Sequence, residues 1–338
     1  ANGWLNSAVS GWSGRRVTEV TSVGTTTLTV STGDLAQYST TANVYIHAIA
    51  GGGGGALGSD VSSPGGGGGA GAYVYRVLTR DSENIINLVD NSNISVIVGA
   101  GGSSAVGSNV EATNSSITYE TVISGNISVS LLRGGMGYSG FPGDEDGGSG
   151  SGADWKDGVP GTGIGTSPSD GEDPAGHDGS NEDVPGGASL RSAGGGGGVY
   201  SDADDATTNT GGDGGQGIIG TAYTGSSTYG LPSNFDNINI SGLPLANVFI
   251  GEGGGGGGLT PGVPKNAIGV PGAHQSGGTG GTGSANATTV VANTGSGGGG
   301  GRYDTTGAGS VYYPGSTGAD GSFAISYKAA WRKFTSSL

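Results

Sequence analysis

Few residues of this chain combine the types and spacing that chemistry requires. Residues 212–217 match GxGxxG, the pattern that wraps a pyrophosphate where a strand turns into a helix. No apolar strand precedes the match, and glycine is so frequent here, 80 of 338 residues, that such patterns arise by chance. We therefore expect no nucleotide cofactor.

The residues that usually bind metals or activate nucleophiles are equally scattered. His47, His177 and His274 lie in unrelated segments, the chain has no cysteine, and no zinc-protease, nucleophile-elbow or P-loop motif occurs. The acidic stretch at residues 202–205 lacks the glycine and glutamate of an EF-hand loop. We expect no catalytic residue, no metal site and no enzymatic activity.

Charge is distributed unevenly along the chain. The formal net charge is −15, with acidic residues concentrated between 144 and 183 and basic residues near the two ends. An acidic surface repels phosphate, so we expect no nucleic-acid partner, and the simplest role of the acids is to keep loops solvated. No apolar run approaches the roughly 20 residues of a membrane span, so we expect no membrane insertion.

Aromatic residues stand out in the polar, glycine-bounded segments. Such residues either fill gaps beneath loops or form the rigid contacts of binding loops, and the sequence leaves both roles open. As receptor-binding candidates we select Tyr138, Phe141, Trp155, Tyr223, Tyr229, Phe235, Tyr303, Tyr312 and Tyr313.

Runs of consecutive glycine decide how these residues are held. They occupy residues 51–55, 65–69, 194–198, 253–258 and 297–301. Five glycines in succession favour neither helix nor strand, so the runs are either flexible linkers or extended polyproline-II segments packed where only hydrogen fits. Because only 32% of the residues are hydrophobic, a conventional core serves only part of the chain, and we expect backbone hydrogen bonds between packed glycine segments to hold the rest.

Short β-branched segments predict strands in the remainder. Residues 17–23 and 25–30 flank Gly24 and suggest a hairpin, with further strands at 73–78, 94–98, 117–123 and 127–132. We expect residues 323–327 to pair with the early strands, and very little helix. The predicted fold is mostly irregular and β: an attachment β unit (residues 1–48), a glycine-rich polyproline-II and β domain with variable loops (49–328), and a basic aromatic tail (329–338).

The opening of the chain carries a family resemblance. Trp4 and Trp12 each follow a glycine ahead of Arg15 and Arg16, residues 31–38 and the strand at 44–48 follow, and glycine runs then alternate with variable segments. This pattern resembles the distal-tip adhesins of the long tail fibres of T-even-like bacteriophages. The resemblance implies a sandwich of glycine-rich polyproline-II helices with loops gathered at the tip.

It also implies partners and a location. The N-terminal unit would attach to a tail fibre or other virion protein through Trp4 and Trp12, aided by Trp331 if the C-terminus returns to the same end. The loops would bind a bacterial outer-membrane protein or surface glycan, which places the protein at the tail fibre tip of the virion. The alternative is a non-adhesive virion protein that decorates a capsid or joins fibres.

Overall fold

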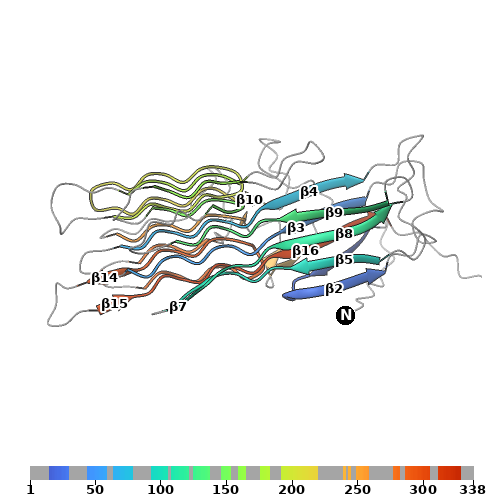
Figure 1. Ribbon diagram of the computed structural model, residues 1–338, viewed down its shortest axis with the longest axis horizontal. Coiled ribbons are helices and arrows are strands. Elements are labelled where there is room, and N and C mark those ends of the chain that lie inside the picture. The colour runs from blue at the N-terminus through green and yellow to red at the C-terminus, as the bar shows by residue number, and fades with distance from the viewer. Residues whose placement is uncertain are drawn as a thin grey trace, which may run out of the picture.

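The computed structural model shows an elongated molecule with two β-sheets at one end and a bundle of extended segments at the other (Figure 1). The structure describes residues 15–29, 44–58, 64–78, 93–105, 108–121, 125–137, 146–153, 159–164, 176–182, 192–219, 239–240, 243–244, 249–258, 277–281, 286–304 and 311–328. None of these residues is helical, as expected, and so they include no helix long and apolar enough to cross a membrane.

The first sheet joins the two ends of the chain. Its strands are antiparallel in the order β1-β16-β3-β4. They span β1 Arg15–Val20, β16 Ser322–Lys328, β3 Val44–Ile49 and β4 Tyr73–Leu78. The predicted pairing of residues 323–327 with early strands is therefore confirmed, and β16 lies between two of them.

The second sheet is built from the first part of the chain alone. Its antiparallel order is β2-β5-β8-β9, from β2 Gly24–Thr29, β5 Asn93–Val98, β8 Ser115–Thr121 and β9 Gly125–Leu131. Every second residue of β5 is buried, namely Ile94, Val96 and Val98. This alternation turns one face of the sheet inward and leaves the other to solvent.

The hydrophobic core includes residues of both sheets. Ile46, Phe323 and Ile325 of the first sheet and Ile94 and Leu131 of the second belong to one buried cluster. The predicted hairpin around Gly24 is wrong, because β1 pairs with β16 and β2 with β5. The β-branched pattern marked both strands, but the bend between them carries the chain from one sheet to the other.

In the bundle, hydrogen bonds recur at every third residue. Segment 50–56 donates to segment 64–72 through Ala50 N–H to Ala72 O, Gly53 N–H to Gly69 O and Ala56 N–H to Gly66 O. Between these residues, Gly52 and Gly55 donate to a different neighbour, segment 314–321. A repeat of three with no bond inside a segment is the geometry of the polyproline-II helix.

Segment 64–72 is enclosed on all sides. It donates backbone hydrogen bonds to three neighbouring segments and accepts them from three others. The acceptors lie in segments 294–301, 192–197 and 132–135, and the donors in segments 50–56, 149–152 and 251–257. The glycine runs are therefore packed structure, since buried backbone groups need partners and here the neighbouring backbones supply them.

Glycine is required because the backbones approach so closely. A Cβ added at Gly196 would overlap the carbonyl oxygen of Gly68, and one added at Gly68 would overlap that of Gly53. At the junction with the sheets, Gly251 and Gly295 adopt φ of 66° and 61°, and an added Cβ at either would meet the side chain of Ile49. These two positions need glycine for both conformation and space.

The other strands are short. They are β6 Ser103–Ala105, β7 Ser108–Val110, β10 Ile218–Ile219, β11 Asn239–Ile240, β12 Leu243–Pro244, β13 Phe249–Ile250, β14 Arg302–Asp304 and β15 Val311–Tyr313. Within the described ranges, each pairs with one other short strand, as β14 does with β15. The described part of residues 134–317 therefore has only strands of two or three residues.

Candidate functional site

The hairpin of β14 and β15 lies at the end of the bundle farthest from the sheets (Figure 1). Arg302 pairs with Tyr313, Tyr303 with Tyr312, and Asp304 with Val311. We name this hairpin, residues 302–304 and 311–313, the tip hairpin.

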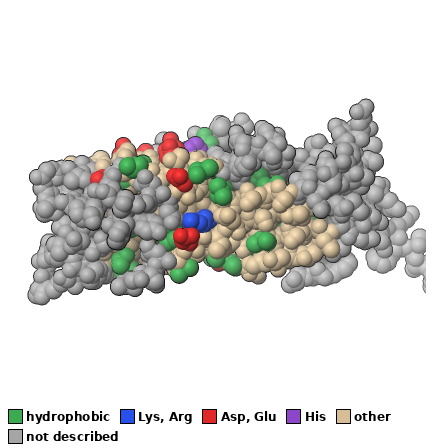
Figure 2. Space-filling view, in the orientation of Figure 1, with side chains coloured by type: hydrophobic (Ala, Val, Ile, Leu, Met, Phe, Trp, Pro, Cys, Tyr) green, Lys and Arg blue, Asp and Glu red, His purple; other side chains and the backbone are tan. Residues whose placement is uncertain are grey.

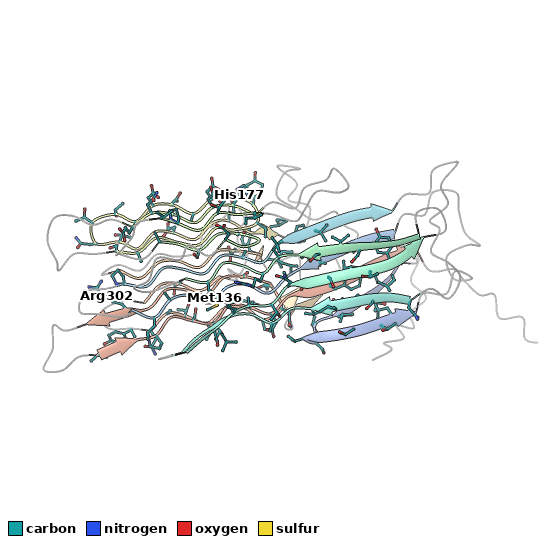
Figure 3. The ribbon with its side chains drawn as sticks, viewed as in Figure 1. Met136, His177 and Arg302 are labelled. Atoms are coloured by element: carbon teal, nitrogen blue, oxygen red, sulfur yellow. The ribbon has the colours of Figure 1, made fainter. Side chains whose placement is uncertain are left out.

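The bundle fixes the position of the tip hairpin. Segment 294–301 leads into β14, and segment 314–321 leaves β15 beside it. The two segments are bonded to each other through Ser316 N–H to Gly299 O and Ala319 N–H to Ser296 O. Arg302, at the base of the hairpin (Figure 3), is buried, whereas Val311 is exposed. The tip hairpin is thus a direct continuation of two segments that are hydrogen-bonded to each other.

Other segments end at the same level of the bundle. Gly301 O accepts from Gly65 N–H, Gly65 O accepts from Gly257 N–H, and Gly300 O accepts from Gly281 N–H. Segments 50–58, 251–258, 277–281 and 294–301 run toward the tip hairpin, and segments 64–72 and 314–321 run back. The bundle therefore brings together points of the chain that are far apart in sequence.

Only part of the predicted site falls on described residues. Tyr303, Tyr312 and Tyr313 are brought together in the tip hairpin, and Tyr313 is half-buried. Outside the described residues lie Trp4, Trp12, Tyr138, Phe141, Trp155, Tyr223, Tyr229, Phe235, His274 and Trp331. Their assigned roles stay predictions.

Acidic residues along one long edge of the bundle have a role that the sequence did not reveal. Figure 2 shows acidic side chains beside a histidine on this edge. The carboxylate of Asp178 accepts from Gly163 N–H at 2.8 Å, that of Asp205 from Asn181 N–H at 2.8 Å and that of Asp146 from Thr162 N–H at 2.9 Å. The side-chain oxygens replace backbone carbonyls where the bundle ends. We name Asp146, Asp178, Asp202 and Asp205 the acidic edge.

The described histidines have opposite environments. His177 lies on the outside of the bundle (Figure 3), with its Nδ1 3.0 Å from a carboxylate oxygen of Asp202. His47, in β3, is 1% exposed, and its ring centroid lies 5.1 Å from that of Tyr73. Burial lowers the pKa of His47 from 6.5 to about 3. The imidazole is therefore a neutral packing group at physiological pH.

The glycine motif that resembles a nucleotide-binding loop has a structural role in the bundle. In residues 212–217, Gly212 N–H donates to Ala193 O and Gly215 N–H to Gly196 O, so these amides are engaged within the bundle and do not face a phosphate. Within the described ranges, no group of three or more His, Cys, Asp or Glu residues could hold a metal ion.

The glycine-rich sequence of the chain matches a known protein family. Residues 20–328 match the glycine-rich domain family, and the chain belongs to this family. The match covers the bundle and both sheets, apart from Arg15–Glu19 of β1. No curated protein shows significant sequence similarity to the chain.

Proposed function

We propose that the protein is a bacteriophage tail-fibre tip adhesin, which binds the surface of a host bacterium without chemical catalysis. The observation that carries the proposal is the tip hairpin, where Tyr303, Tyr312 and Tyr313 continue hydrogen-bonded bundle segments. A hairpin whose backbone is already anchored loses little conformational entropy when it binds, and tyrosine is a frequent contact residue of such loops. The resemblance of the chain to tail-fibre adhesins supplies the biological setting.

The sheet end is the proposed attachment end. Arg15 of β1 pairs with Lys328 of β16, so the chain enters and leaves the first sheet at the same point. Trp12 precedes Arg15 by three residues and Trp331 follows Lys328 by three. This pairing supports a joint role of Trp4, Trp12 and Trp331 in docking onto a tail fibre or other virion protein.

The negative charge of the bundle restricts the class of receptor that the protein could bind. The acidic edge lies along the same bundle that carries the tip hairpin. Carboxylates repel the phosphates of lipopolysaccharide, which favours basic loops of an outer-membrane protein or a neutral surface glycan.

Adsorption measurements test the proposal. A variant with Tyr303→Ala, Tyr312→Ala and Tyr313→Ala should keep its melting temperature within a few degrees but reduce phage adsorption at least about tenfold, as loss of aromatic anchors does elsewhere. Tyr200→Ala, in the body of the bundle, is the matched control and should adsorb normally.

Antibody labelling of virions distinguishes a location at the fibre tip from a location on the capsid. Antibody to the chain should label fibre tips. Label over the capsid, together with unchanged adsorption of the triple variant, would favour the decoration or fibre-joining alternative.

A further inference from the structure

Strand β2 is an open edge of the second sheet. It pairs on one side with β5. Among the residues that the structure describes, none bonds to the backbone of Gly24–Thr29 on the other side. Thr25 and Thr27 are exposed, and Val23 just before the strand is 50% exposed. Within the described part of the chain, the outer side of the strand thus presents a row of unpaired backbone donors and acceptors.

This edge lacks the usual protection against pairing. Natural edge strands are blocked by charges, prolines or bulges. The edges of the first sheet follow that rule, with Arg15, Arg16 and Glu19 in β1 and Arg76 in β4. The sequence of β2, GTTTLT, has no charge and no proline, and four of its six residues are threonine.

The edge is complementary to itself. In antiparallel pairing of two β2 strands that keeps the outer residues on the outer face, Thr25 lies opposite Thr27 of the other copy, or Thr27 lies opposite its own equivalent. Threonine pairs across antiparallel strands are favourable. We propose that β2 pairs with β2 of a second copy about a two-fold axis, which joins the two second sheets into one continuous sheet.

The charge distribution is compatible with this arrangement. The strands run roughly along the long axis of the molecule (Figure 1). Antiparallel pairing therefore points the two bundles in opposite directions, which separates their acidic edges. Because two chains of net charge −15 still repel each other and the strands are short, the dimer is weak and strengthens with salt.

Strand β9 offers a competing mode of pairing between copies, and it also supplies the control for the experiment. It is the other edge of the same sheet, its sequence GNISVSL is also uncharged, and Ser128 and Ser130 are exposed. Pairing of β2 with β9 of another copy has no two-fold axis and adds copies without closing. Pairing of β2 with β2 leaves no β2 edge free and stops at two.

Sedimentation equilibrium of the full chain, from roughly 1 µM to 1 mM in high salt, tests the proposal. Wild type should show a monomer–dimer equilibrium. Thr25→Lys with Thr27→Lys should raise the dissociation constant at least tenfold, although the variant has a smaller net charge. Ser128→Lys with Ser130→Lys adds the same charge and should dimerise like wild type.

Three outcomes would overturn the inference. They are a monomeric wild type throughout the range, a β2 variant that dimerises normally, and a β9 variant that fails to dimerise. Thermal unfolding of each variant checks that the monomer is folded. The inference does not depend on receptor binding by the tip hairpin, which lies at the opposite end of the molecule, and β2 belongs to a different sheet from β1 and β16, which flank the proposed attachment residues.

Discussion

At the scale of single residues, the bundle depends on the missing side chain of glycine. An added Cβ at Gly196 would overlap Gly68 O, which already accepts a hydrogen bond from Gly254 N–H. Gly196→Ala should therefore separate three segments and lower the unfolding free energy by more than about 3 kcal/mol, from overpacking and lost hydrogen bonds. Urea unfolding measures the loss.

Gly24→Ala is the control for backbone conformation. Gly24 has a φ of 112°, but no atom lies within 4 Å of an added Cβ. The same substitution there should cost only about 1–2 kcal/mol of backbone strain. Equal losses for the two variants would show that collision between segments does not determine stability.

Buried His47 predicts a pH dependence of stability. Its pKa is about 3 in the folded protein, against 6.5 for an ordinary histidine. Between those values the unfolded chain holds a proton that the folded chain lacks, so the histidine contribution is complete above pH 6.5 and falls by about 1.4 kcal/mol per pH unit as the pH decreases toward 3. His47→Gln should remove that part of the slope. Identical slopes for urea unfolding of the two proteins would contradict the assignment.

At the scale of elements, the enclosed segment 64–72 should be the slowest part of the bundle to exchange its amide protons. All its neighbours must open before its N–H groups meet water. Segment 201–206 lies at the acidic edge, where Asp202, Asp204 and Asp205 are exposed and no further segment covers them in the described part of the chain. Amide protons of peptides that cover residues 64–72 should exchange on the order of a hundredfold more slowly than those of peptides that cover residues 201–206. This ratio corresponds to a difference of about 2.8 kcal/mol in the free energy of opening. Similar rates in hydrogen-exchange mass spectrometry would show that the bundle opens locally.

The same elements show what the sequence could and could not predict. The strands at 73–78 and 127–132 were recognisable because β-branched residues specify a strand through their own side chains. Glycine carries no such information, so the runs predicted packed polyproline-II helices but not that segment 64–72 would lie at the centre. The hairpin error at Gly24 has a related cause, since strand residues do not specify the sheet in which they pair. Tyr303 and Tyr312 were found by type, but their pairing depends on segments 294–301 and 314–321.

At the scale of the whole molecule, the C-terminal part completes both ends of the fold. Among the described strands, β16 is the only partner of β1, and it lies between β1 and β3, with Phe323 and Ile325 in the core. Segment 314–321 accepts hydrogen bonds from Gly52 and Gly55 and donates to segment 294–301. The first half of the chain therefore cannot complete the first sheet or the bundle alone.

Deletion of residues 314–338 should consequently abolish cooperative unfolding. The loss of a central strand and a bundle segment exceeds the roughly 5–15 kcal/mol by which a domain is stable. Deletion of residues 329–338 is the control, because every described pairing of β16 ends at Lys328. The shorter deletion should keep the calorimetric transition but, if Trp331 helps to dock the protein, should weaken assembly into virions. A cooperative transition in the longer deletion would show that the N-terminal part folds without the C-terminal strand.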